Sequence, residues 1–207
     1  MNKPVCLPAP PVIHARIKPL RLRPRVRKIS RSLPEATGVK VVFARTQSVA
    51  EAIEASLRET RVSLNAALYS FSSPRLFKAL CDAQERGVRV RLLVDRGKYE
   101  ANPTTRELLS RAQFDIRVTR GRNGAGSKMH HKFVLLDDRM VLTGSYNWTS
   151  ASEEQNHENL LIFADRTVVD QYREEFDSLW ASADAAQRAE STDSTPALAQ
   201  APSPVLQ

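Results

Sequence analysis

The sequence predicts an α/β fold in which a mixed β-sheet is covered by helices on both faces. Short apolar runs typical of buried strands alternate with amphipathic segments of helical length, and they do so at the spacing of strand–helix units. Hydrophobic residues make up 42% and charged residues 26% of the 207, the ordinary proportions of a globular domain. No apolar run approaches the length that crosses a membrane.

Regular structure is expected from Val39 onward. The run VKVVFAR, which begins there, indicates a buried strand. Residues 48–60 (SVAEAIEASLRET) carry apolar residues at helical spacing, and Ser48 is a suitable N-cap, so this segment is expected to be a helix. The apolar run VSLNAALYSF at residues 62–71 predicts a second strand.

The middle of the chain repeats this alternation. Residues 73–86 are expected to form a helix because a Ser-Pro pair opens the segment and Gly87 ends it. VRVRLLVD at 88–95 predicts a third strand, residues 104–112 a further helix, and residues 114–119 a fourth strand.

The last part of the domain begins with the Gly-rich loop GRNGAGSK at residues 121–128. Residues 129–148 predict two strands separated by a turn at Asp137-Asp138, because these turn formers interrupt an otherwise apolar stretch. A strand at 159–163 and a helix at about 167–182 complete the expected domain.

Charge divides the chain into three parts: an arm at 1–37, a domain at 38–184 and a tail at 185–207. Up to Pro34 there are nine Lys or Arg and no acid, whereas the remainder carries 22 basic and 23 acidic residues. The arm also holds seven prolines, which oppose a helix and break any signal-peptide apolar stretch. It is interpreted as a flexible, phosphate-neutralising arm or solvated tail, with mitochondrial targeting as the alternative. The Ala/Ser/Pro/Gln-rich tail is expected to be disordered.

Only two cysteines are present, Cys6 and Cys81, which excludes a disulfide framework and a cysteine-rich zinc site. This usage fits a reducing compartment, and no export signal is recognisable, so a cytoplasmic location is expected. A periplasmic or exported protein and a mitochondrial one are the alternatives.

Polar side chains around the stretch MHHKFVLLDDRMVLTGSYNW predict a phosphate-binding site. Because side chains alternate along a strand, His130 and Lys132 share one face while His131 points to the other. Ser145 and Asn147 are also two residues apart, and the turn between the two strands returns them beside the first pair. An ammonium group and an amide can hold phosphate oxygens while an imidazole attacks or transfers a proton.

Nearby residues extend this prediction. Glu158, just before the last strand, is expected to accept the second ring N–H of the histidine and fix its tautomer. The Gly-rich loop fails the P-loop pattern, because its lysine comes one residue late and Met129 follows. It is interpreted either as a lip that turns basic side chains toward substrate or as a solvated turn. The basic residues in question are Arg120, Arg122 and Lys128.

A metal site is a weaker interpretation of the same residues. His130, His131, His157 and Glu158 are chemically suitable ligands, but strand alternation places the first two on opposite faces. Trp148 and Trp180 are expected to be core or dimer-interface aromatics.

These residues match a known pattern. H-x-K-x(4)-D-x(6)-G-S-x-N is met without a gap, and it resembles the signature of the phospholipase D superfamily. Upstream, ALYSFSSPRLFKAL and ERGVRVRLLVD resemble its single-motif members, the bacterial Nuc-type endonucleases and the mitochondrial cardiolipin hydrolase/Zucchini group. The resemblance covers about residues 39–180. The matching positions are His130, Lys132, Asp137, Gly144, Ser145 and Asn147.

The resemblance implies a two-step phosphodiester cleavage that needs no metal and no cofactor. His130 would attack phosphorus to give a phosphohistidine, while a second histidine protonates the leaving oxygen. Lys132 and Asn147 would bind the phosphate with support from Ser145, and Glu158 would orient a histidine. Asp137 would hold the conformation of the motif.

The mechanism needs two such motifs, and His14, His131 and His157 do not begin a second one. A homodimer with one active site shared across a two-fold axis is therefore expected. A non-specific endonuclease acting on DNA or RNA is the first functional hypothesis, and a phospholipid phosphodiesterase is the second. A non-catalytic nucleic-acid-binding module is the third, and replacing His130 separates it from the others because binding alone needs no nucleophile.

Overall fold

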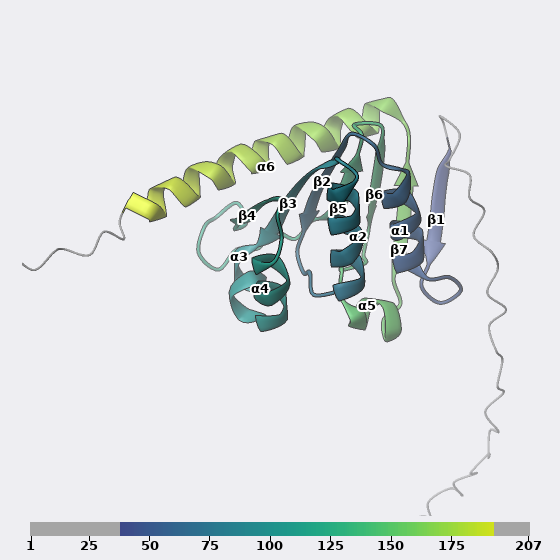
Figure 1. Ribbon diagram of the computed structural model, residues 1–207, viewed down its shortest axis with the longest axis horizontal. Helices are drawn as coiled ribbons and strands as arrows, with labels where there is room; N and C mark the ends of the chain where they lie inside the picture. The colour runs from purple at the N-terminus through teal and green to yellow at the C-terminus, as the bar shows by residue number, and fades with distance from the viewer. Residues whose placement is uncertain (1–37, 193–207) are drawn as a thin grey trace, which may run out of the picture.

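The protein is described by a computed structural model in which residues 38–192 have a defined backbone and residues 38–183 defined side chains. Seven strands form one sheet in the order β1-β7-β6-β5-β2-β3-β4 (Figure 1). The expected arm at 1–37 and residues 193–207 of the expected tail lie outside the described residues, so the arm and that part of the tail stay predictions. The strands are β1 (Val39–Phe43), β2 (Ser63–Leu68), β3 (Arg89–Asp95), β4 (Asp115–Thr119), β5 (Lys132–Leu136), β6 (Met140–Gly144) and β7 (Asn159–Phe163).

The sheet is mixed, as predicted. β2, β3 and β4 run parallel to one another, while β5 pairs antiparallel with β2 and β6, and β7 pairs antiparallel with β6 and β1. The hairpin between β5 and β6 turns at Asp137 and Asp138, whose φ angles are 52° and 49°. Aspartate tolerates this left-handed region better than most side chains, which is why the pair makes a tight hairpin turn.

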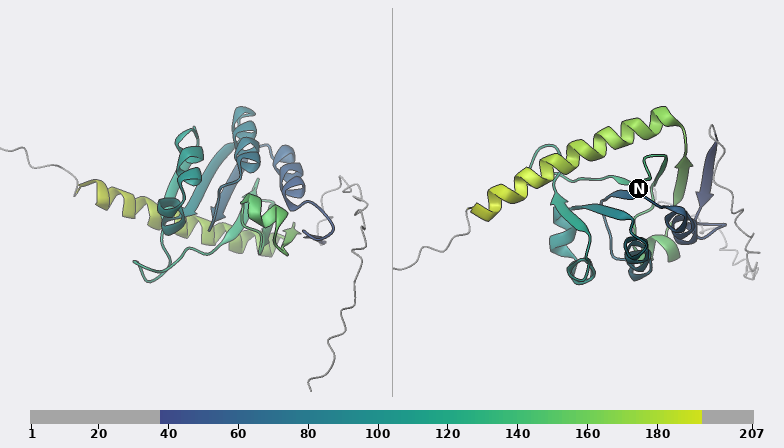
Figure 2. Two further views of the ribbon diagram at one scale, coloured as in Figure 1. Left: turned by 90° about the horizontal axis from the view of Figure 1, so that it is seen from below. Right: turned by 45° about the horizontal axis from the view of Figure 1, so that its top comes forward.

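Helices cover both faces of the sheet, which confirms the predicted fold class. Figure 2 shows α6 alone on one face and the other long helices on the opposite face. The helices α1 and α2 begin where predicted. Ser48 and Ser73 are their N-caps, and each side-chain hydroxyl accepts a backbone N–H from the first turn. The helices are α1 (Val49–Glu59), α2 (Pro74–Glu85), α3 (Arg96–Ala101), α4 (Pro103–Ser110), α5 (Ser150–Glu154) and α6 (Arg166–Thr192).

The strand that carries the motif is buried on both sides. Val134 and Leu136 of β5 pack into the apolar layer formed with α1 and α2, while Phe133 and Leu135 pack into the layer formed with α6. This accounts for the uninterrupted apolar run FVLL, because a strand covered on both faces has no solvent-facing position. Trp148 and Trp180 are 3% and 9% exposed, so both are core residues of this chain.

Two short helices and one helix end differ from the expectation. α3 was not predicted, because Gly97 lies in its first turn and its N-cap, Asp95, also ends a strand. α5 was not predicted either, since five residues are too few for a periodic pattern. α6 continues to Thr192, beyond the expected end near residue 182 and into the tail expected to be disordered from residue 185, because the Ala-rich residues there contain neither Gly nor Pro.

Within residues 38–192, none of the helices combines the length and the apolar character needed to cross a bilayer.

Candidate active site

His130 and Lys132 meet at the start of β5. His130 precedes the strand and Lys132 is its first residue. The ammonium nitrogen of Lys132 lies 3.4 Å and 3.5 Å from the two ring nitrogens of His130, and it donates to the His130 carbonyl at 3.0 Å. The His131 ring points to the other side, where Nε2 lies 3.0 Å from Oε1 of Glu175 on α6. The two histidines therefore have separate environments, as strand alternation predicted.

Two residues that the sequence did not single out hold the segment before β5. The ring of Tyr69 lies against that of His130, with 4.2 Å between the centroids, and the Tyr69 backbone N–H donates to the His131 carbonyl at 2.7 Å. Asp95 is 3% exposed, and its Oδ2 accepts from the Met129 N–H at 2.9 Å. The contacts come from the ends of β2 and β3, so only the assembled sheet reveals them.

Burial, followed by the positive charges of Lys132 and Lys128, lowers the pKa of His130, while the charge of Asp95 opposes the shift. A lowered pKa keeps the imidazole neutral, and a neutral ring nitrogen is the form that can act as a nucleophile. Burial also lowers the pKa of Lys132, and the negative charge of Glu158 opposes this shift.

The second half of the motif is organised around Glu158, which is 9% exposed. Its Oε2 accepts a short hydrogen bond from the Ser145 hydroxyl, and its Oε1 accepts from the Asn156 side-chain amide at 3.1 Å. The Ser145 oxygen in turn accepts from the Asn159 N–H at 3.2 Å. The expected hydrogen bond from a histidine ring to Glu158 is thus replaced by Ser145 and Asn156, because the motif's second strand and β7 bring these two closer.

Gly144 is required where β6 meets β7. A Cβ at this position would lie 2.3 Å from the Asn159 carbonyl oxygen, which is well inside van der Waals contact. Any side chain would therefore separate the two strands that bring Ser145 to Glu158.

Asn147 lies next to the segment that follows β2, because its neighbour Trp148 is hydrogen-bonded to that segment. Trp148 forms an isolated bridge with Phe71, and its N–H donates to the Ser70 carbonyl at 3.1 Å. The side-chain oxygen Oδ1 of Asn147 is buried and has no hydrogen-bond partner among the described residues. A buried acceptor without a donor is costly, and only a hydrogen-bond donor can satisfy Oδ1, whereas a phosphate oxygen would accept from the amide Nδ2.

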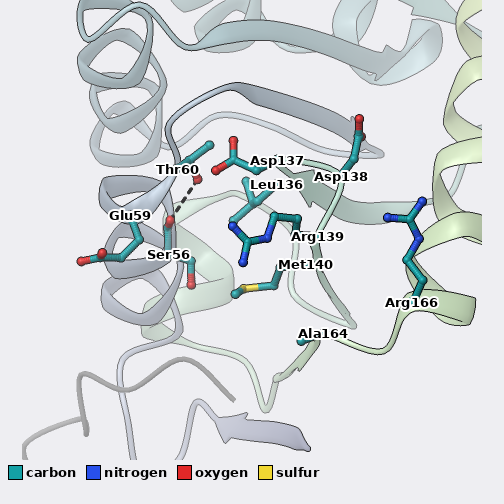
Figure 3. A pocket seen from close by; sticks show the side chains of 10 residues that line it. All are labelled: Ser56, Glu59, Thr60, Leu136, Asp137, Asp138, Arg139, Met140, Ala164 and Arg166. Atoms are coloured by element: carbon teal, nitrogen blue, oxygen red, sulfur yellow. Dashed lines mark hydrogen bonds between the residues drawn. The ribbon is translucent and has the colours of Figure 1, made fainter. Parts of the chain in front are cut away.

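Asp137 lies at the opposite end of β5. Seven residue steps separate it from His130, and the five residues of β5 alone extend over about 17 Å at about 3.4 Å per residue. Its carboxylate accepts from the backbone N–H groups of Arg61, Val62 and Ser63, with shortest distances of 3.0, 2.7 and 2.9 Å. Asp137 lines a pocket of about 430 Å³, and none of the other motif side chains lines it. Figure 3 shows the side chains that do. Asp137 thus ties the hairpin turn to the entry of β2, in line with the conformational role expected of it.

A second, larger pocket of about 690 Å³ opens beside His130, and it is called here the basic pocket. The three predicted lip residues line it together with one further cation, Arg96, which the sequence did not single out. Glu175 and His131, which pair with each other, lie on its α6 side. Its basic residues are Arg96, Arg120, Arg122 and Lys128.

Gly121 allows the loop around this pocket to close on itself. A Cβ there would lie 2.6 Å from both the backbone nitrogen and the oxygen of Lys128. Arg120 also reaches Glu100, with 3.9 Å between nitrogen and oxygen, so the loop is linked to α3.

His157 lines a separate pocket of about 460 Å³ with Phe43 and Arg45, and Glu158 borders it too. Within the described side chains, no group of three or more His, Cys, Asp or Glu residues is arranged to hold a metal ion.

Comparisons with known proteins identify relatives of this chain and a solved structure that resembles it. Residues 53–180 match the family described as cardiolipin synthase, PLD-like domain. The mitochondrial cardiolipin hydrolase of Mus musculus is 33% identical over 147 residues, which are 71% of this chain and 65% of that protein. The Homo sapiens protein of the same name is 38% identical over 125 residues, covering 60% of this chain and 48% of that one. This chain therefore spans about half to two thirds of the length of these relatives.

A solved structure with the same fold is that of Nuc from Salmonella typhimurium, described as a phospholipase D family member. It superposes with a TM-score of 0.64 at 23% identity and covers 70% of this chain and 94% of Nuc. The likeness confirms the predicted phospholipase D-like fold.

Proposed function

Because the chain belongs to the phospholipase D-like family, as its motif predicted, we propose that it is a phosphodiesterase, a hydrolase of ester bonds. We further infer that it is a non-specific endonuclease for DNA, RNA or both. The observation that carries this function is the Lys132 ammonium, which lies 3.4 Å from a ring nitrogen of His130, a residue that lines the basic pocket. A neutral imidazole beside a fixed cation suits attack on a phosphodiester, and the additional cations suit a polyanion.

The proposed reaction has two steps. A ring nitrogen of His130 forms a bond to phosphorus while the bond from phosphorus to the leaving oxygen breaks, and an imidazolium supplies the proton that this oxygen takes. Lys132 and Asn147 bind the non-bridging oxygens. Water then attacks the phosphohistidine, its proton passes to the histidine that has become neutral, and His130 is released.

The remaining motif residues have supporting roles in this proposal. Ser145 and Glu158 hold the second strand of the motif and place a negative charge near Lys132, while Asp137 fixes the hairpin turn. Arg120, Arg122 and Lys128 bind substrate from the basic pocket. The mechanism uses only protein groups, and neither a metal nor a cofactor has a role in it.

The second histidine is proposed to be His130 of the partner subunit, in a homodimer with one shared active site. His131 is turned toward Glu175, and the chain carries one motif. An exposed apolar stripe on β1 supports an interface: Val39, Val41 and Phe43 are 53%, 45% and 56% exposed, on the side of the strand opposite buried Val42. The stripe reaches the site, because Phe43 shares a pocket with Glu158.

A phospholipid phosphodiesterase is the second candidate. It is favoured by the relatives named mitochondrial cardiolipin hydrolase, at 33% and 38% identity. The same histidine chemistry applies to a lipid phosphodiester, so the two candidates differ in what lies next to the scissile phosphate. A cytoplasmic location stays a prediction, to be checked by cell fractionation.

The test is cleavage of labelled single- and double-stranded DNA and RNA, and of cardiolipin vesicles, in excess EDTA. Wild-type protein is compared with His130→Ala and with the near-isosteric His130→Asn. We expect nucleic-acid cleavage by the wild type alone, with acid-labile phosphate trapped on His130 after rapid quenching. Cleavage of cardiolipin alone would favour the second candidate, and loss of activity in EDTA would refute the metal-independent mechanism. Binding without cleavage by both wild type and His130→Ala would indicate a non-catalytic nucleic-acid-binding module.

A further inference from the structure

The aromatic ring of Tyr69 is surrounded by positively charged and titratable groups. The ammonium nitrogen of Lys132 lies 5.0 Å from its centroid and that of Lys98 lies 5.1 Å from it, while the His130 ring lies at 4.2 Å. Lys98 comes from α3, an element that contributes no residue to the motif. An electron-rich ring attracts ammonium groups at these distances, so Tyr69 brings Lys98 to the nucleophile.

The charge of Lys98 is not matched by a carboxylate. Its side chain is exposed and forms no ion pair with the described acidic side chains. Asp95, the N-cap of α3, accepts from the Lys98 backbone N–H with one oxygen at 3.0 Å and from the Met129 N–H with the other at 2.9 Å. Two ammonium groups around one ring repel each other, and an anion between or beside them would relieve that repulsion.

We propose that Lys98 is an additional substrate-binding residue that contacts a phosphate next to the scissile one, and that Tyr69 positions its ammonium group. The proposal rests on the proposed function and specifies its substrate as a chain of phosphodiesters. The Lys132 ammonium lies beside the His130 ring, so it is the group that contacts the scissile phosphate, which His130 attacks. Lys98 supplies a second positive charge on a different element, which a substrate with a single phosphate does not use.

The distances suit this division. Since both ammonium nitrogens lie about 5 Å from the same centroid, they are at most about 10 Å apart. This span allows consecutive phosphates of one strand to contact one ammonium group each. The affinity that such contacts supply is electrostatic, so it should decline with added salt.

The experiment compares Lys98→Gln with wild type on two substrates, a single-stranded oligonucleotide and bis(p-nitrophenyl) phosphate, which has one phosphate. We expect kcat/KM for the oligonucleotide to fall about tenfold, the loss typical of one hydrogen bond to a charged group, and that for the small diester to stay unchanged. Lys98→Arg should restore cleavage. Lys78→Gln, which removes an exposed lysine charge on α2, is the matched control and should behave as wild type.

Oligonucleotide binding is measured in the His130→Ala background, so that this readout does not require turnover. Affinity falls as salt rises, and removing Lys98 should make the plot of log affinity against log salt less steep by about 0.7, the value for one phosphate contact on a single strand. An unchanged slope, or equal losses on both substrates, would overturn the role of Lys98 even if wild type cleaves normally. Conversely, failure of wild type to cleave would count against the endonuclease while a reduced slope still supported Lys98.

The positioning role of Tyr69 is tested by asking whether the effect of replacing Lys98 depends on the Tyr69 ring. Tyr69→Phe keeps the ring and should keep activity, whereas Tyr69→Leu should lower cleavage of both substrates because the ring also contacts His130. In the Tyr69→Leu background, Lys98→Gln should add little to the oligonucleotide loss. Full additivity of the two losses would show that Tyr69 does not position Lys98.

Discussion

Replacing Asp137 by alanine is expected to make the domain easier to unfold while leaving the chemistry of the folded protein in place. The carboxylate accepts the backbone N–H groups of three consecutive residues, 61–63, and these link α1 to β2. Alanine removes the carboxylate that accepts all three N–H groups, and it must also adopt the left-handed φ of 52° that Asp137 has in the hairpin turn. The site at His130 lies at the other end of β5 and loses no contact.

The magnitude follows from these contacts. Hydrogen bonds to a charged group contribute about 1.5–3 kcal/mol when buried, and about 1 kcal/mol each is reasonable at this half-exposed turn. The left-handed backbone adds about 1 kcal/mol for alanine. Asp137→Ala should therefore lose about 4 kcal/mol of unfolding free energy, which for a domain of this size lowers Tm by about 10 °C. Asp137→Asn keeps one acceptor oxygen and tolerates the same φ, so it should lose about half as much.

The assay combines thermal and urea unfolding with turnover measured well below the transition. Both variants should cleave substrate at close to the wild-type kcat when folded, and the stability order should be wild type, then Asn, then Ala. A variant that is as stable as wild type but has lost turnover would refute the reasoning, because it would place Asp137 in the chemistry. Equal losses for Asn and Ala would show that the charge matters rather than the acceptor geometry.

Three further predictions concern the site and the interface. Lys128→Gln removes a positive charge that lowers the pKa of His130, so that pKa should rise and the acidic limb of the kcat/KM–pH profile should move to higher pH; an unmoved limb would contradict the coupling. Gly144→Ala places a Cβ 2.3 Å from the Asn159 carbonyl oxygen, and should cost about 3 kcal/mol in urea unfolding and lower turnover; wild-type stability would show that the strands can separate freely. Val41→Asp puts a charge in the exposed apolar stripe and should yield an inactive monomer in sedimentation equilibrium; an intact dimer would exclude this face as the interface.

Local patterns predicted the elements that matter most for the site. The alternation along MHHKFVLLDDRMVL separated His130 from His131, and the structure turns the second ring to Glu175 on α6. The Asp137-Asp138 turn was predictable for the same reason, because a hairpin needs residues that accept positive φ. α3 was missed because its start is stabilised by the side chain of Asp95 rather than by an apolar repeat.

The roles of Tyr69, Lys98 and Glu158 were not predictable, since each depends on neighbours far away in sequence. Glu158 looked free to accept from a histidine until the pairing of β6 with β7 placed Ser145 against it. Tyr69 looked like an ordinary strand residue until β2 and β5 aligned its ring with His130.

By itself, the sequence determined the α/β class, the strand that carries the motif, the identity of its polar residues and the neutral charge of the domain behind a basic arm, because these follow from periodicity, spacing and composition. The tertiary structure alone decided which side chains meet. Strand order and register brought the ends of β2, β3 and β5 together with α3. Register is set by packing across the whole sheet, and a contact between residues dozens of positions apart leaves no trace in local sequence.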